Sequence, residues 1–106
     1  MTDTPVQPVT VVFWRDIPAQ VIVGKGRRGA KVQLPERFEQ AIDRCAMKGG
    51  ARDTDSYLAD WRKADAYYVA GEPESVARAE AARLEEAYDT ARIKALIAND
   101  GWEAGA

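Results

Sequence analysis

Residues 9–23, VTVVFWRDIPAQVIV, contain two runs of β-branched and aromatic residues with four residues between them. Such side chains favour extended backbone, so residues 9–14 and 19–23 are predicted to be strands. A parallel crossover needs about a dozen residues or more, and residues 15–18 are too few for one. The two strands therefore form an antiparallel hairpin, with Pro18 in its turn.

The first of these strands is apolar on both of its faces. Alternate residues of a strand point to opposite faces. The two sets are Val9, Val11 and Phe13, and Thr10, Val12 and Trp14. A strand with this pattern is expected inside a sheet, covered at least in part on both sides.

The next segments alternate between extended and helical patterns. Residues 30–34 are predicted to be a short extended stretch, and Pro35 then opens a helix that ends at Gly49. The apolar face of this helix consists of Phe38, Ala41, Ile42, Cys45 and Ala46. A second, short helix starts at Asp53 or Thr54 as its cap and buries Tyr57, Leu58 and Trp61. Residues 65–69 are predicted to be a third strand.

Helix-forming residues then run from Glu74 to about Ala98. Their apolar stripe consists of Ala77, Ala81, Leu84, Tyr88, Ala91 and Ala95. Ile93, Leu96 and Ile97 fall off that stripe. Either the helix bends near residue 92, or its final turns meet a different surface such as another subunit.

The elements predict an α+β protein in the order β-β-α-α-β-α. The simplest packing is a small two-layer sandwich, with the antiparallel hairpin and a third strand packed against a long C-terminal helix. The 106 residues suit one domain over residues 9–98, with a flexible leader at 1–8 and a tail at 99–106.

The composition argues against several classes of protein. The chain has no histidine, so it lacks the commonest general base and the commonest metal ligand. Its one cysteine, Cys45, allows no intrachain disulfide, which suits a reducing cytoplasm. No apolar stretch approaches the roughly 20 residues that span a bilayer, and the N-terminus lacks the basic start of a signal peptide. We therefore expect a cytoplasmic protein without membrane contact.

The charge is unevenly distributed along the chain. Residues 1–63 carry 11 lysines and arginines against 8 acids, and residues 64–106 carry 4 against 9. Domains that bind nucleic acid generally are strongly basic, and this chain has a net charge of −2. Nucleic acid is therefore not an expected partner.

Residues 24–29 read GKGRRG and have the glycine spacing of a dinucleotide-binding fingerprint. That fingerprint needs a helix to begin at its third glycine, within a parallel β-α-β unit. Here Gly29 is followed by AKVQLP, so no helix can begin before about residue 35, and the preceding strand belongs to a hairpin. The pattern is therefore not interpreted as a nucleotide site.

Four cations nevertheless lie within seven residues of this loop: Lys25, Arg27, Arg28 and Lys31. One interpretation is a solvated turn whose charges keep the protein soluble. The other is a site for an anion or an acidic partner, because glycine backbone beside guanidinium groups suits phosphate and carboxylate.

For two further patterns, a structural role is a better explanation than catalysis or metal binding. Cys45 lies on the apolar face of its helix, where a thiol is a poor nucleophile, and it is predicted to be structural. The acids of DTDSYLAD, residues 53–60, resemble a calcium loop only briefly, because Tyr57 and Leu58 occupy a ligand position and the glycine position. Helix capping explains these acids better.

A tryptophan–arginine pair occurs twice, as Trp14-Arg15 and as Trp61-Arg62. The tryptophans are predicted to be pieces of the core. The alternative is an exposed aromatic and cationic interface, since tryptophan, tyrosine and arginine dominate binding hot spots. Trp102 in the tail, together with the two tyrosines at 67–68, would enlarge such an interface.

The segments VTVVFWRDIPAQVIV, GRRGAKVQLPERFEQAIDRCA and DTDSYLADWRKADAY, across about residues 9–70, resemble the small bacterial family of virulence factor domains. The resemblance implies a single-domain cytosolic protein that works alongside others, related to longer multi-domain virulence factors. It brings no catalytic residues. Standalone members of the family are encoded near folate- and corrinoid-dependent one-carbon enzymes, which implies a second role as an accessory subunit there.

We therefore expect a non-catalytic protein-interaction domain rather than an enzyme, with no cofactor and no metal. Its contact surface would combine the loop at residues 24–31, the strand end at Trp14-Arg15 and the end of the long helix. A homodimer through the C-terminal helix is an open alternative. The competing hypothesis is an accessory subunit of one-carbon metabolism whose basic loop holds a polyanionic ligand such as a polyglutamylated folate.

Overall fold

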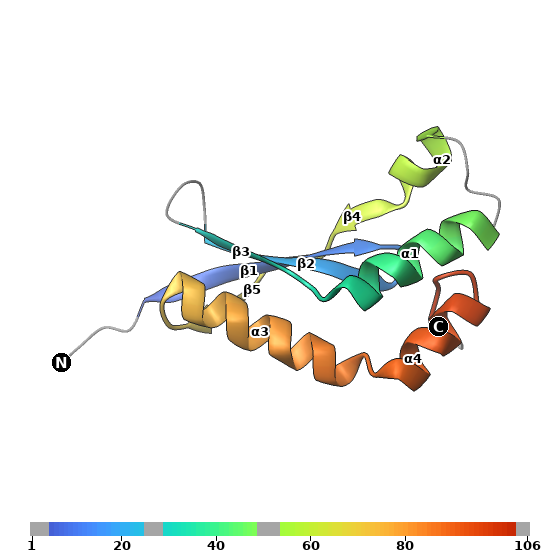
Figure 1. Ribbon diagram of the computed structural model, residues 1–106. Helices are drawn as coiled ribbons and strands as arrows, with labels where there is room; N and C mark the ends of the chain where they lie inside the picture. The colour runs from blue at the N-terminus through green and yellow to red at the C-terminus, as the bar shows by residue number, and fades with distance from the viewer. Residues whose placement is uncertain (1–4, 25–28, 49–53, 104–106) are drawn as a thin grey trace.

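The computed structural model describes residues 5–24, 29–48 and 54–103. In this part of the chain, five strands form one antiparallel sheet, and four helices pack against it or against each other (Figure 1). The strands are β1 (Val6–Trp14), β2 (Ile17–Val23), β3 (Ala30–Gln33), β4 (Trp61–Lys63) and β5 (Tyr67–Ala70). The helices are α1 (Glu36–Lys48), α2 (Thr54–Ala59), α3 (Pro73–Ala87) and α4 (Thr90–Ala98). The predicted α+β class is confirmed.

The hairpin at the start of the chain is also confirmed. β1 and β2 pair antiparallel from Val9 opposite Val23 to Trp14 opposite Ile17. The turn is shorter than predicted and consists of two residues, of which Arg15 has a positive φ of 55°. Pro18 lies inside β2 rather than in the turn. It stands opposite Phe13, where the register shifts, and such an irregularity tolerates a residue without an N–H group.

β2 and β3 form a second antiparallel pair, with Ala30 opposite Val23. The chain therefore leaves Gly29 as a strand and not as a helix, which confirms that the glycine pattern is not a dinucleotide fingerprint. The predicted helix opening is confirmed as well: α1 begins directly after Pro35, whose carbonyl accepts a hydrogen bond from the Phe38 N–H at 2.9 Å.

The rest of the sheet differs from the prediction. The order is β3-β2-β1-β4, with β5 also paired to β1, so β1 is the central strand. β1 begins at Val6 rather than at residue 9, because residues 6–9 pair with residues 67–70. The strand predicted at residues 65–69 is β5, at residues 67–70. A further short strand, β4, precedes it, and Trp61 belongs to β4 instead of the helix before it, because it pairs with Trp14.

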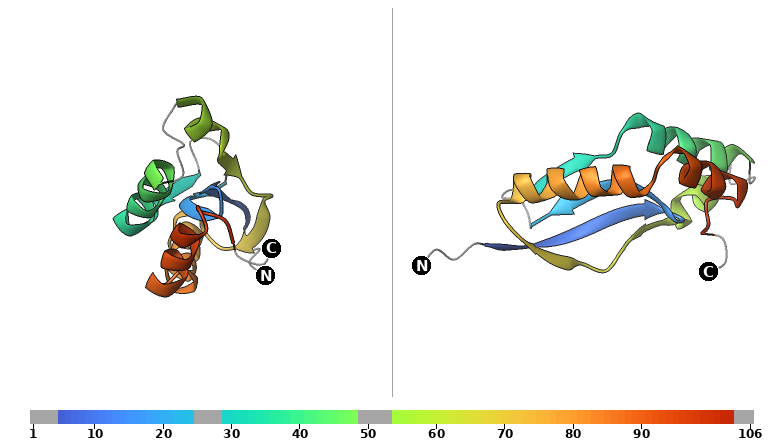
Figure 2. Two further views of the ribbon diagram at one scale, coloured as in Figure 1. Left: turned by 90° about the vertical axis from the view of Figure 1, so that its right-hand side faces the viewer. Right: turned by 90° about the horizontal axis from the view of Figure 1, so that it is seen from below.

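Most helices lie on one side of the sheet. α3 packs against β2 and β3, and α1 packs against β2 and α4. Figures 1 and 2 show α3 and α4 beneath the sheet, whereas α2 stands above one end of it. The core lies between the sheet and the helices beneath it. Its largest fully buried members include Phe38, Ile17, Leu96 and Val21.

The long C-terminal helix is two helices. Asp89 caps α4 by accepting a hydrogen bond from the Arg92 N–H at 2.9 Å, so the chain turns at residues 88–89 and not near residue 92. The turn rotates the apolar stripe. Ala91 and Ala95 are exposed, whereas the off-stripe residues Ile93 and Leu96 are buried in the same core. These two side chains are therefore not available to a second subunit.

Candidate interaction surface

One face of the sheet has no helix along most of its length. Val9, Val11, Val21 and Val23 are buried on the other face, beneath which α3 lies. Their neighbours along each strand point the opposite way, and the strand register groups them into one surface. We call it the open face; it consists of Val6, Pro8, Thr10, Val12, Gln20, Ile22, Lys31, Gln33, Lys63, Tyr68 and Ala70. Of the described helices, only α2 lies on this side (Figure 2).

The open face is more apolar than a solvated sheet face should be. Antiparallel sheets with one wet side alternate apolar and polar residues, so the wet side is polar. Here Val12 and Ile22 lie at its centre and are only partly buried. Val6 and Tyr68, from neighbouring strands, are 60% and 69% exposed. Exposed apolar patches of this kind are typical of binding surfaces, so the open face is a candidate interaction surface.

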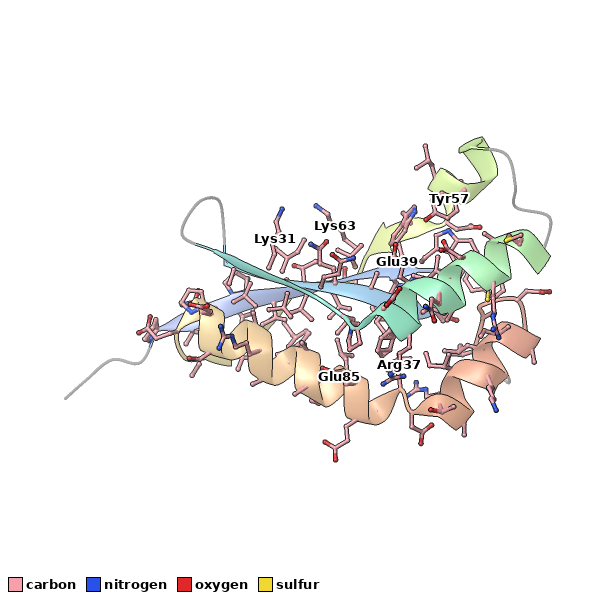
Figure 3. The ribbon with its side chains drawn as sticks, in the orientation of Figure 1. Lys31, Arg37, Glu39, Tyr57, Lys63 and Glu85 are labelled. Atoms are coloured by element: carbon pink, nitrogen blue, oxygen red, sulfur yellow. The ribbon has the colours of Figure 1, made fainter. Side chains whose placement is uncertain are left out.

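Two lysines flank this apolar strip. Lys31 stands opposite Ile22 and Lys63 opposite Val12 in the strand register. Both side chains point to the same side of the sheet as Tyr57 (Figure 3). Their hydrocarbon stems can cover apolar neighbours while the ammonium groups stay in water. No residue assigned to the open face is acidic, so the face carries positive charge alone.

A groove continues the open face toward α2. A cavity of about 230 Å³ lies between α1, α2 and the strands, and Gln33 of the open face lines it. Tyr57 and Trp61 form its aromatic wall, with ring centroids 5.9 Å apart. Glu39 of α1 lies across from Tyr57 (Figure 3). Leu58, predicted to be buried with them, is 57% exposed instead, because the short helix turns it outward.

Beyond the groove, Arg15 joins three parts of the chain. Its guanidinium lies 4.5 Å from the ring centroid of Trp14 and 5.8 Å from that of Trp102. Its Nε donates to a carboxylate oxygen of Asp60 at 3.0 Å, and it also donates to the carbonyl of Asp100. Only 12% of the Arg15 side chain is exposed, so its principal role is to hold the tail and the loop before β4 onto the hairpin.

A second ionic contact lies beside it. Asp16 accepts one hydrogen bond from Arg62 at 2.9 Å and another from the Glu103 N–H at 2.7 Å. Glu103 in turn accepts a hydrogen bond from Arg92 at 2.7 Å. The Arg62 side chain remains 45% exposed, as does Trp102. Both residues are therefore accessible to a partner at this end of the molecule.

The structure thus brings five of the sequence-predicted site residues together. Trp14, Arg15, Trp61, Arg62 and Trp102 all lie at the α2 end of the sheet. Trp14 is completely buried, the interpretation favoured for it, and donates its indole N–H to the Tyr57 carbonyl at 3.0 Å. Trp14 therefore packs beneath Tyr57 and cannot itself touch a partner.

The structure describes only one of the four cations of the basic loop. Lys25, Arg27 and Arg28 lie outside the described residues, as does Asp53. Lys31 is described, and its side chain lies on the open face beside Ile22, away from Arg15. Cys45 is buried, as predicted.

Sequence reasoning missed the residues at the centre of the open face, Val12, Ile22 and Lys63. The signal was present in the first strand, whose two apolar faces both require cover. The sequence did not reveal which face the helices would take.

The shifted pKa values belong to side chains on the helical side. Burial, and then the hydrogen bond to the Glu80 carboxylate, raise the pKa of Tyr67. Burial raises the pKa of Tyr88. The hydrogen bond to Glu103 raises the pKa of Arg92. Each of these groups therefore keeps its ordinary protonation state at neutral pH.

Three further features of the described residues concern unpaired buried polar atoms, clusters of metal ligands and helices that could span a membrane. Within residues 5–24, 29–48 and 54–103, every buried side-chain nitrogen and oxygen has a hydrogen-bond partner, and no three acidic, histidine or cysteine side chains are grouped to hold a metal ion. The helices in that part of the chain are too short or too polar to cross a membrane.

The comparisons with known proteins gave one match. The model of a family described as virulence factor matches residues 12–97, from the middle of β1 almost to the end of α4. The matched span includes Lys31, the groove and both tryptophan–arginine pairs. No curated protein and no solved structure matches the chain.

Proposed function

The chain belongs to the virulence factor family, and we propose that it acts as a non-catalytic protein-interaction domain whose partner covers the open face of the sheet. The observation that carries this proposal is the mismatch between pattern and packing. β1 is apolar on both faces, but the described helices cover only one of them along most of its length. The partner supplies the missing cover.

The size of the face fits this role. Strands spaced about 4.8 Å apart and rising about 3.3 Å per residue give an open face on the order of 400 Å². A specific interface buries roughly 800 Å² on each partner. The open face alone is therefore about half of an interface, and the groove with Tyr57 and Trp61 and the exposed Arg62 and Trp102 extend it.

The chemistry of the rim supports a protein partner. Aromatic and arginine side chains provide most of the binding energy in protein interfaces, and partly buried apolar residues provide the area. Lysines at the rim mainly raise the rate of association with an acidic surface. The open face, the groove and the arginine–tryptophan end follow one another along β1 and β2, so one partner can contact all three.

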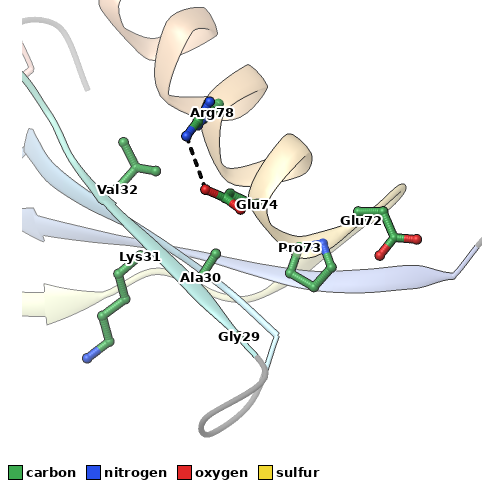
Figure 4. A pocket seen from close by; sticks show the side chains of 8 residues that line it. All are labelled: Gly29, Ala30, Lys31, Val32, Glu72, Pro73, Glu74 and Arg78. Atoms are coloured by element: carbon green, nitrogen blue, oxygen red, sulfur yellow. Dashed lines mark hydrogen bonds and ion pairs between the residues drawn. The ribbon is translucent and has the colours of Figure 1, made fainter.

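The role as an accessory subunit that holds a polyanion has less support. Of the four loop cations only Lys31 is described, and it points away from α3 (Figure 4). The cavity beside its strand is lined by Glu72 and Glu74 as well as by Arg78. Two carboxylates repel a polyanion, so this cavity does not favour the second function.

Site-specific photo-crosslinking in the native cells tests the proposal. We expect a photoreactive phenylalanine at position 68 or 10 to give one discrete protein adduct, identified by mass spectrometry. The matched control is position 82, where Ala82 is exposed on α3 on the other side of the sheet. Adducts at position 82 with the same yield, or none at positions 68 and 10, would refute the proposal.

A further inference from the structure

β3 forms one edge of the sheet, and half of its backbone groups point away from the sheet. The Leu34 N–H donates to the Ala19 carbonyl at 3.0 Å, and Val32 stands opposite Val21. In an antiparallel pair, residues that bond to the neighbouring strand alternate with residues that do not. The backbone N–H and C=O groups of Lys31 and Gln33 therefore face outward along the free edge.

A second groove, distinct from the one lined by Tyr57 and Trp61, runs beside this edge. A cavity of about 570 Å³ lies between β3 and the first turns of α3. Ala30, Val32 and Pro73 provide its apolar surface, while Glu74 and Arg78 pair with each other at 3.0 Å on its helical side (Figure 4). This volume lies within the range of about 300–1,000 Å³ that is typical of ligand pockets.

The two features together define a site for a strand. We propose that an extended segment of the partner adds to β3 as a further antiparallel or parallel strand, with an acidic side chain beside Lys31. Main-chain hydrogen bonds to Lys31 and Gln33 would provide affinity, and alternate side chains would enter the groove against Ala30, Val32 and Pro73. The inference rests on the proposed role as an interaction domain and specifies the form of the partner.

The acidic position follows from the geometry of paired strands. Side chains opposite each other on one sheet face are about 5 Å apart, and opposite charges there stabilise the pairing. Lys31 lies on the open face, so the residue of an added strand opposite it would lie on that face too. The neighbouring residues of the segment would face α3, where Ala30 and Val32 favour small apolar side chains.

A purely protective role for Lys31 is the competing explanation. Charged residues on edge strands prevent the edges of two copies from pairing. In that case Lys31→Ala would make the protein self-associate, and no extended peptide would bind. The added strand predicts the reverse for both observations.

Selection from a random heptapeptide library displayed on phage tests the site, with the full chain as the target. Gln33→Pro removes the outward N–H group but no hydrogen bond to β2. Gln33→Thr is the matched control that keeps the N–H. We expect peptides with an acidic residue among β-branched ones, which protect the amides of residues 31 and 33 from hydrogen exchange. Their affinity should fall at least tenfold on Gln33→Pro and remain within twofold on Gln33→Thr.

Lys31→Glu provides a second variant that leaves the backbone intact. We expect selection on it to change the acidic residue of the peptides to a basic one. Equal affinity for Gln33→Pro and the wild type, protection elsewhere, an unchanged preference on Lys31→Glu, or no enriched peptide would each overturn the inference. Adducts at positions 68 and 10 would still stand in that case, so failure of the added strand is distinguishable from failure of the interaction role.

Discussion

The two faces of the sheet are built from the same strands, with similar residues, and have different surroundings. Val21 and Val23 lie beneath the helices and are completely buried. Ile22, between them, points to the open face and is only partly buried. Because side chains alternate along a strand, one run of three β-branched residues serves both the core and the candidate interface. Apolar residues in a strand thus indicate that the face must be buried, either by helices of the same chain or by a partner.

Matched substitutions on the two faces should have the largest difference in effect. We expect Val21→Asp to abolish folding, because an unpaired carboxylate in the core costs several kcal/mol, comparable with the whole stability of a small domain. Ile22→Asp should cost at most about 1–2 kcal/mol and leave the fold intact. Urea unfolding followed by circular dichroism measures both. Equal losses would mean that the open face is part of the core of the isolated domain.

The next largest effect concerns the α2 end of the sheet, where Arg15 and Arg62 lie. We expect Arg15→Gln to lower the free energy of unfolding by about 2 kcal/mol, since it leaves the partly buried Asp60 without its cation and loosens Trp102. Arg62→Gln should lower it by at most about 1 kcal/mol, because its ion pair with Asp16 is exposed. A larger loss for Arg62 would show that the roles of the two arginines are reversed.

These elements also show how far the sequence determines the fold. The hairpin at residues 9–23 and the helix after Pro35 follow from local patterns, and both were predicted. Trp61 was assigned to a helix because its three-residue strand forms through pairing with Trp14, which no local pattern records. The break at Asp89 had a local signal, an aspartate that can cap a helix, but the good helix formers on both sides concealed it.

The candidate site shows the same division. The tryptophan–arginine pairs indicated a shared location, and the fold places them at one end. The centre of the open face was not identified, since its apolar residues have the same types as those of the core. Only the positions of α3 and α1, which pack against β2, distinguish Ile22 from its neighbours.

Binding should distinguish the faces more finely than stability does. We expect the double substitution Lys31→Glu and Lys63→Glu to slow association with an acidic partner about tenfold at low salt and to change stability by less than about 0.5 kcal/mol. The control is the matched double substitution Arg44→Glu and Lys94→Glu, which changes two exposed cations on α1 and α4. Stopped-flow or surface-based kinetics with the cross-linked partner measure the rate. Equal effects of the control would assign the partner to the helical side.

The smallest effect is a pH dependence that belongs to the helical side. The pKa of Tyr67 is raised in the folded protein, so the unfolded chain loses this proton first as the pH rises. Stability is therefore fully present below pH 10 and falls as the pH passes through 10 toward the raised value. We expect a smaller loss between pH 9 and 11 in Tyr67→Phe than in the wild type, with parallel curves between pH 6 and 8. Identical losses above pH 9 would contradict the assignment.

A methyl NMR titration of the full chain with the partner identified by cross-linking tests directly whether the open face binds that partner. We expect the methyl signals of Val6, Val12 and Ile22 to shift or broaden on binding, while those of Val21 and Val23 change little. Changes confined to Val76 and Leu84, which pack on the helical side, with Val12 and Ile22 unaffected, would contradict it.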